Sequence, residues 1–177
     1  MHAAQLHPAG SPTPPAMIPC FDPATGEALG EVAVDSPDAV RAAVKASREA
    51  QRKWRTSSFA ERRKVLGHIL DHLVDQADEL VDFVVRDSGK TRENAMLGEI
   101  WPVAEKLRWT MGQGEKHLKP ERVSSGLFPH KKALIEFYPL GVVGIIAPWN
   151  YPLQNILGPA IPALFFATYG GEGGARQ

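Results

Sequence analysis

The stretch from Pro139 to Pro152, PLGVVGIIAPWNYP, decides the fold of this chain. Every residue from Gly141 to Ala147 is apolar or glycine, and prolines lie on both sides of the run. A short continuous apolar run of this kind is typical of a strand that is buried on both faces of a parallel sheet. The stretch therefore predicts an α/β domain with a buried strand over residues 141–147.

Asn150 closely follows this predicted strand. In doubly wound sheets, ligands bind beyond the carboxyl ends of the strands. An asparagine at that place can present two amide hydrogens to an oxygen that gains negative charge. The residues alone leave a second interpretation open, in which Asn150 caps a turn ahead of Pro152.

Upstream, the sequence predicts a β-hairpin followed by a helix. Turn-forming residues from Asp22 to Gly26 separate two short extended runs within residues 20–34. Ser36, followed by Pro37, begins a helix that we expect to run to about Trp54. The side chains expected on its buried face are Val40, Ala43, Val44, Ala50 and Trp54.

A second helical pattern starts at the capping box that Ser58 forms with Glu61, and it closes near Gly89. Its length predicts a break at residues 75–78. Thr91 caps the next helix, in which Pro102 predicts a kink because proline removes a backbone donor. The expected buried face of that helix consists of Ala95, Ile100, Val103, Ala104, Leu107 and Met111.

The remainder predicts a polar loop, an extended segment over residues 132–138, and a helix over residues 152–166. Pro159 and Pro162 lie inside that last helix, and we expect them to distort it or split it. Several helices that precede strands, with one helix after them, favour an α/β domain in which the sheet has only begun.

Composition excludes several classes of partner. Twenty basic residues balance 20 acidic ones over 177 residues, so no net field favours nucleic acid, an acidic substrate or an anionic membrane. The single cysteine, Cys20, rules out an internal disulfide and favours a reducing compartment, and we expect a cytoplasmic protein. Between Glu136 and Glu172 the chain has no charge, but its repeated prolines argue against a membrane span.

Three other motifs carry no predicted chemistry. Cys20 follows Pro19 in the first hairpin, where the sequence places no histidine or helix N-terminus beside it, and we interpret it as an inert structural thiol. His68 and His72 are four residues apart without a third ligand, so a solvated helix face is the better interpretation and no metal is predicted. The run from Gly112 to Gly114 lacks the third glycine and the preceding strand of a dinucleotide fingerprint.

The stretch PLGVVGIIAPWNYP resembles the cofactor-entry strand of the NAD(P)-dependent aldehyde dehydrogenases almost letter for letter. The similarity extends from about Ile18 to Phe166 and includes FDPATG at residues 21–26, DSGKT at 87–91 and EKLR at 105–108. This resemblance implies an α/β fold in which a helical amino-terminal region leads into the start of a Rossmann-like parallel sheet, here incomplete.

The resemblance also implies roles for five residues. In that family, the residues that match Ile146, Ala147, Pro148 and Trp149 line the nicotinamide side of the cofactor cleft. The residue that matches Asn150 donates hydrogen bonds to the oxyanion of the thiohemiacetal. The implied cofactor is NAD or NADP, the implied substrate is a small-molecule aldehyde, and intact family members are homo-oligomers.

The family's nucleophilic cysteine and general-base glutamate would come after Phe166, and this sequence has neither. We therefore expect a disordered leader over residues 1–17, a partial cofactor-binding domain over 18–166 and a divergent glycine-rich tail over 167–177. A frameshift or premature gene end would explain such a chain, which we expect to be inactive alone. The alternative is a non-enzymatic decoy subunit that pairs with a full-length homologue, and the choice of aldehyde and of NAD or NADP stays open.

Overall fold

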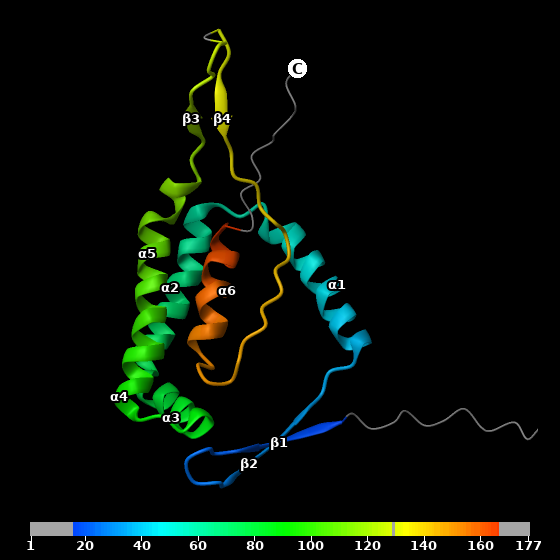
Figure 1. The fold of residues 1–177 in the computed structure, drawn as a ribbon, viewed down its shortest axis with the longest axis vertical. Helices are drawn as coiled ribbons and strands as arrows, with labels where there is room; N and C mark the ends of the chain where they lie inside the picture. The colour runs from blue at the N-terminus through cyan, green and yellow to red at the C-terminus, as the bar shows by residue number, and fades with distance from the viewer. Residues whose placement is uncertain (1–15, 129, 167–177) are drawn as a thin grey trace, which may run out of the picture.

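The computed structural model describes residues 16–128 and 130–166 as a group of packed helices with two small β-hairpins at its periphery (Figure 1). The predicted leader and tail fall mostly on residues 1–15 and 167–177, which lie outside the described residues, whereas Met17 already belongs to a strand. In chain order the elements are β1 (Met17–Phe21), β2 (Ala28–Ala33), α1 (Pro37–Trp54), α2 (Phe59–Asp75), α3 (Ala77–Ser88), α4 (Arg92–Ala95), the π-helical turn η1 (Met96–Ile100), α5 (Trp101–Gln113), the 3-10 turn η2 (Gly114–Leu118), β3 (Glu121–Val123), β4 (Ala133–Ile135) and α6 (Gln154–Phe166).

Helices α2, α3, α5 and α6 form the helical body, in which α5 packs against both α2 and α6. Figure 1 shows α2, α5 and α6 side by side, although α6 is separated from α5 by about 40 residues of chain. The body and the adjoining turn of α4 and η1 bury one apolar cluster that consists of Leu66, Leu73, Val81, Val84, Ala95, Ile100, Val103, Ala104, Leu107, Ile161 and Phe165. The predicted buried face of residues 95–107 is therefore confirmed.

Local capping signals define most helix boundaries as the sequence predicts. The Ser36 hydroxyl accepts from the Ala39 N–H, and Ser58 and Glu61 form a reciprocal capping box. The expected break falls at Gln76 between α2 and α3, and Gly89 ends α3 with a left-handed φ of 67°. These helix ends are therefore confirmed. The sequence could predict them because a cap satisfies orphan backbone groups within one turn of the helix.

Pro102 lies in the first turn of α5, directly after the π-helical turn η1. The Trp101 N–H bonds the carbonyl of Met96, five residues earlier, so the helix is wider by one residue here. The structure thus has a π turn directly before Pro102, an irregularity of the kind at which helices kink.

Helix α6 was expected to be distorted or split by Pro159 and Pro162, and it runs unbroken from Gln154 to Phe166. Each proline removes the hydrogen bond to the carbonyl four residues earlier. Burial of Ile161 and Phe165 against the helical body compensates for these losses, so the prediction of a split is wrong.

The structure has two antiparallel hairpins within residues 16–128 and 130–166, and no parallel pair among those residues. The first, β1 with β2, confirms the hairpin predicted around the Asp22 turn, where the Asp22 carboxylate accepts from the Ala24 and Thr25 N–H groups. The second pairs β4 with β3, a strand that the sequence analysis took for loop, and it projects away from the helical body (Figure 1).

Two expectations of burial are wrong. Helix α1 forms where predicted but buries no residue, and Val40 and Val44 on its expected inner face are exposed. Residues 141–147 form an extended segment without strand pairing to any described residue, instead of a buried strand. In both cases the apolar pattern is present but no described segment covers it, so burial fails for lack of a partner.

Candidate functional site

The PLGVVGIIAPWNYP stretch crosses beside α6 and then turns to enter that helix (Figure 1). Along it, Ile146 is fully exposed and Trp149 is 65% exposed. Pro148 and Asn150 are exposed as well, and Ala147 is half-buried. The five residues to which the resemblance gives roles therefore form one continuous strip on the surface of the described chain.

A buried ion pair holds the end of this strip. Lys90 Nζ lies 2.6 Å from Oε1 of Glu99 and 2.8 Å from the backbone carbonyl oxygen of Asn150. The same ammonium group lies 3.6 Å from the centre of the Tyr151 ring, a cation–π contact. Lys90 thus connects the loop after α3 to the turn that contains Asn150.

Glu99 completes this arrangement from the other side. Its side chain is 0% exposed, and its Oε2 accepts hydrogen bonds from the N–H of Leu153, at 2.8 Å, and of Gln154, at 3.3 Å. These are donors at the start of α6 that have no partner inside the helix. The carboxylate therefore acts as the N-terminal cap of α6, where negative charge is also favoured by the helix dipole.

Local sequence explains why these groups meet. Gly89 has a positive φ and a Cβ there would lie 3.2 Å from the Ala24 nitrogen, so glycine allows the turn that leads into Lys90. The π turn η1 carries Glu99, and Gly98 in the same turn leaves room for the Tyr151 ring, which a Cβ would approach to 3.2 Å. Each side chain of the pair is placed by a glycine and a backbone irregularity next to it.

The side-chain amide of Asn150 makes no hydrogen bond to any residue in the described part of the chain, whereas its carbonyl is bound to Lys90. An exposed asparagine on an anchored turn keeps both amide hydrogens available to an oxygen that develops negative charge. Oxyanion stabilisation by Asn150 is the chemistry that this arrangement can support.

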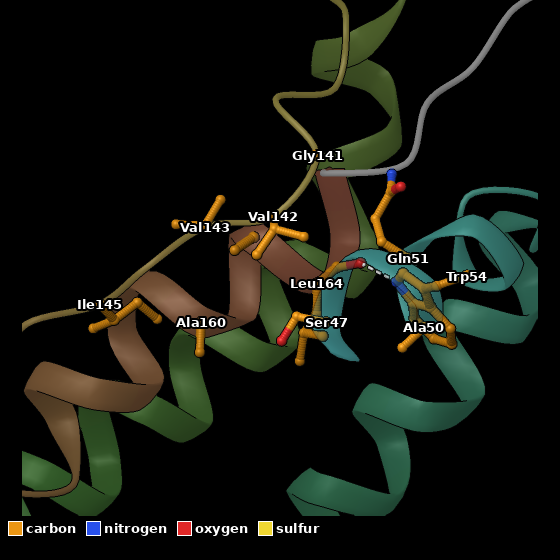
Figure 2. Close-up of a pocket in the computed structure, with 11 residues that line it drawn as sticks. Ser47, Ala50, Gln51, Trp54, Gly141, Val142, Val143, Ile145, Ala160 and Leu164 are labelled. Atoms are coloured by element: carbon orange, nitrogen blue, oxygen red, sulfur yellow. Dashed lines mark hydrogen bonds between the residues drawn. The ribbon is translucent and has the colours of Figure 1, made fainter. Parts of the chain in front are cut away.

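A cleft of about 350 Å³ lies nearby between α1, α6 and the extended segment (Figure 2). Val142, Val143 and Ile145 line one side, and Ala50 and Trp54 of α1 line the other. The Trp54 indole nitrogen donates to the Leu164 carbonyl at 2.9 Å, drawn as a dashed line in Figure 2, and this bond ties α1 to α6. The cleft is mainly apolar, with Ser47 and Gln51 as its polar side chains, and Ile146, Ala147, Pro148 and Trp149 do not line it.

These residues do not by themselves make a dinucleotide site. The strip offers an open apolar surface, and a dinucleotide requires in addition a helix N-terminus or glycine-rich turn for its phosphates. The N-terminus of α6 follows the strip, but there the Glu99 carboxylate already occupies two of the backbone donors. The described residues thus fit one wall of a nicotinamide pocket and not a whole cofactor.

The other sequence motifs stay apart from this strip. His68 and His72 are exposed on α2, as the interpretation of a solvated face predicts, and Cys20 lies half-buried in β1. The described residues contain no group of three histidine, cysteine or carboxylate side chains placed to hold a metal ion. No helix among residues 16–128 and 130–166 combines the length and the apolar character that crossing a bilayer would need.

Two groups elsewhere in the described chain have shifted pKa values. Burial lowers the pKa of the Arg62 guanidinium, which donates at 3.0 Å to the Phe165 carbonyl at the end of α6. The hydrogen bond from the Tyr138 hydroxyl to Glu136 raises the pKa of that tyrosine.

The described chain combines packed helices and two small hairpins with an apolar segment that leads to the exposed Asn150. The model of the aldehyde dehydrogenase family matches residues 11–168, and the chain belongs to that family. An aldehyde dehydrogenase-like protein of Schizosaccharomyces pombe is 38% identical over 149 residues, which are 84% of this chain and 28% of that protein. The family assignment made from residues 139–152 is therefore confirmed.

Solved structures of aldehyde dehydrogenases have the same fold as the described part of this chain. The NADP-dependent glyceraldehyde-3-phosphate dehydrogenase of Bacillus halodurans, in complex with NADP, is 27% identical with a TM-score of 0.75 over 86% of this chain and 33% of its own. The NAD-dependent benzaldehyde dehydrogenase of Corynebacterium glutamicum is 26% identical with a TM-score of 0.74 over 86% of this chain and 32% of its own. The α/β fold class is confirmed, and the chain spans about a third of these relatives or less.

The sequence analysis did not identify Lys90 or Glu99. A signal for Glu99 was present, because it lies four residues after Ala95 and four before Val103, both on the buried face. A carboxylate on an apolar helix face is rarely buried without a partner. Lys90 carried no comparable signal, since its partner Asn150 lies 60 residues further along the chain and its contact with Glu99 depends on the fold of the intervening turn.

Proposed function

We propose that this chain supplies one wall of the nicotinamide pocket and the oxyanion donor of an NAD(P)-dependent aldehyde dehydrogenase, which oxidises an aldehyde to a carboxylic acid. The observation that carries this proposal is membership of the family over residues 11–168. This range includes the whole PWN motif, Pro148 to Asn150. Ile146, Ala147, Pro148 and Trp149 form the wall, and Asn150 is the donor.

The chain's own contribution to the reaction is electrostatic. The Asn150 amide donates to the aldehyde oxygen as that oxygen gains negative charge, and the anchored turn keeps the donor in place beforehand. The nicotinamide cofactor, when bound to the complete enzyme, supplies the hydride acceptor. Apolar side chains beside it limit the access of water to the reacting carbon.

We propose further that the nucleophile and the general base lie outside these 177 residues, so that the chain alone does not turn over aldehydes. Its one thiol, Cys20, lies in β1 with its Sγ 3.7 Å from the Ile18 carbonyl oxygen. The cytoplasmic location, the division at residues 17 and 166, and homo-oligomerisation of the intact enzyme are part of the same proposal. No observation favours the decoy-subunit alternative.

The first test uses the chain alone. Calorimetry with NAD and with NADP measures cofactor binding by the chain. An aldehyde-dependent NADH assay should detect no turnover. Clear turnover would contradict the proposal that the nucleophile lies elsewhere, because no residue of the described site can form the thiohemiacetal.

The second test asks whether Asn150 is the donor. A chimera in which residues 18–166 replace the matching region of the Corynebacterium glutamicum benzaldehyde dehydrogenase allows NADH formation to be measured. Asn150→Ala should lower kcat roughly 10²- to 10³-fold. Asn94→Ala, which removes an exposed amide on α4, is the matched control and should leave kcat unchanged. Equal rates for both variants would contradict the assigned role.

A further inference from the structure

Lys90 and Glu99 form an ion pair that is almost fully removed from water. The Glu99 side chain is 0% exposed and that of Lys90 is 13% exposed. Charges in such places are costly unless geometry and further hydrogen bonds satisfy them. A buried pair of this kind that contributes nothing to the apolar core needs a reason for its presence.

The contacts of the pair concentrate on one short segment. Oε2 of Glu99 accepts from the N–H groups of Leu153 and Gln154, and Lys90 donates to the carbonyl of Asn150 and faces the Tyr151 ring. Apart from the bond between the two charges, every one of these contacts falls on residues 150–154. The pair therefore holds the backbone on the carboxyl side of the Asn150 amide.

Few backbone hydrogen bonds other than those of the pair hold this turn, and Leu153 also packs against the apolar core. In the described part of the chain, no backbone hydrogen bond joins residues 139–149 to another segment, and the strip is exposed. Backbone bonds resume only where the N–H of Asn155 meets the carbonyl of Tyr151 at 3.0 Å. The strip is thus open on its amino-terminal side and is fixed on its carboxyl-terminal side, where Asn150 lies.

We infer that Lys90 and Glu99 are positioning residues for Asn150: they fix the turn from which its amide departs, before any ligand is present. This inference rests on the proposed function for its meaning, since the turn is worth fixing only if Asn150 is a donor. An oxyanion donor acts best when its position needs no rearrangement during the reaction. Glu99 anchors the start of α6, and Lys90 connects that anchor to the Asn150 carbonyl.

The test uses the 177-residue chain and nuclear magnetic resonance, with no cofactor or aldehyde. Lys90→Met keeps the length of the side chain and removes its charge. We expect the backbone amide resonance of Asn150 to move toward the value of an unstructured asparagine, and exchange of the Leu153 and Gln154 amide hydrogens to rise ~10-fold or more. Resonances of the buried methyl groups of Leu66 and Leu107 should not change.

Three further variants make the result specific. Glu99→Gln can still accept from Leu153 and Gln154 but turns an amide donor toward Lys90, so Asn150 should lose its order while α6 stays anchored. Lys90→Arg keeps the positive charge beside Glu99, so most Asn150 resonances should stay at their wild-type positions. Lys116→Met removes an exposed ammonium that only contacts Gln113, and it should change none of these signals.

Two results would overturn the inference. One is an unchanged Asn150 amide in folded Lys90→Met or Glu99→Gln protein. The other is a loss of core methyl dispersion in both variants, which would assign the pair to global stability alone. None of these signals depends on cofactor or aldehyde. An unchanged kcat of the Asn150→Ala chimera would therefore refute the proposed function without refuting the anchoring.

Discussion

The helical body and the outer region differ in how much of their apolar surface is covered, where the outer region denotes α1 with residues 139–149. In the helical body, Leu107 and Phe165 are 0% exposed. In the outer region, α1 has no buried residue and Ile146 is fully exposed. Both regions have the apolar patterning of buried elements, so patterning alone does not decide burial.

The difference shows which part of this chain is self-sufficient. The helical body contains its own partners, since α2, α5 and α6 cover one another. The outer region presents an apolar strip and an apolar cleft that no described segment covers. We therefore expect the stability of the chain to come from the helical body, with little contribution from the outer region.

Cavity-forming substitutions should separate the two regions by the largest effect. Leu107→Ala removes a fully buried side chain and should lower the free energy of unfolding by about 2–5 kcal/mol. Val44→Ala, on a residue of α1 that is 39% exposed, should lower it by less than about 1 kcal/mol. Urea denaturation followed by circular dichroism measures both, and equal losses would contradict the comparison.

Removal of one buried cation should have the next largest effect. The Arg62 guanidinium donates to the carbonyl oxygens of Ser57 and Phe165, at 2.8 and 3.0 Å, and so connects the start of α2 to the end of α6. Arg62→Met leaves these acceptors without that donor and should cost about 1.5–3 kcal/mol. Arg108→Met breaks only an exposed pair with Glu105 and should cost under about 0.5 kcal/mol. A similar urea midpoint for the two variants would show that Arg62 does not join these helices.

Acid should weaken the start of α2 by the smallest amount. The backbone N–H and the hydroxyl of Ser58 donate to Glu61 and lower the pKa of its carboxyl below its ordinary value of 4.5. A lowered folded-state pKa means that this stabilisation is complete above pH 4.5 and is lost as the pH falls through the folded-state pKa.

The loss can be isolated by substitution. Asp22 and Glu93 also have lowered pKa values, so the wild-type chain loses stability below pH 4.5 for several reasons. Glu61→Gln should reduce this acid dependence of the melting temperature, and Glu105→Gln, which leaves the capping box intact, should not. Identical pH profiles for wild type and Glu61→Gln would remove the capping box from the account.

Helix ends were predictable because their signals are local. Ser36, Ser58 and Thr91 each cap a helix where expected, and Gly89 ends α3. The PWN motif likewise located the family and the candidate donor Asn150 without any structure. Such features depend on a few neighbouring residues, which the sequence states directly.

Features that depend on distant partners were not predictable. The exposure of α1, the unpaired state of residues 141–147 and the pairing of β3 with β4 all follow from what is or is not present to cover them. The contact of Lys90 with Asn150 joins residues that are 60 positions apart. Pro159 and Pro162 show the same limit, since packing against the helical body overrides a local signal.

Hydrogen exchange measured by mass spectrometry tests the central claim most directly, namely that the helical body is self-sufficient and that residues 141–147 are uncovered. The amides of α2 and α5 should exchange only through global unfolding, whereas those of Val142 to Ile146 should exchange at nearly the rate of an unstructured peptide. Protection of Val142 to Ile146 equal to that of α5 would contradict the account, because it would require a strand partner that the described chain does not provide.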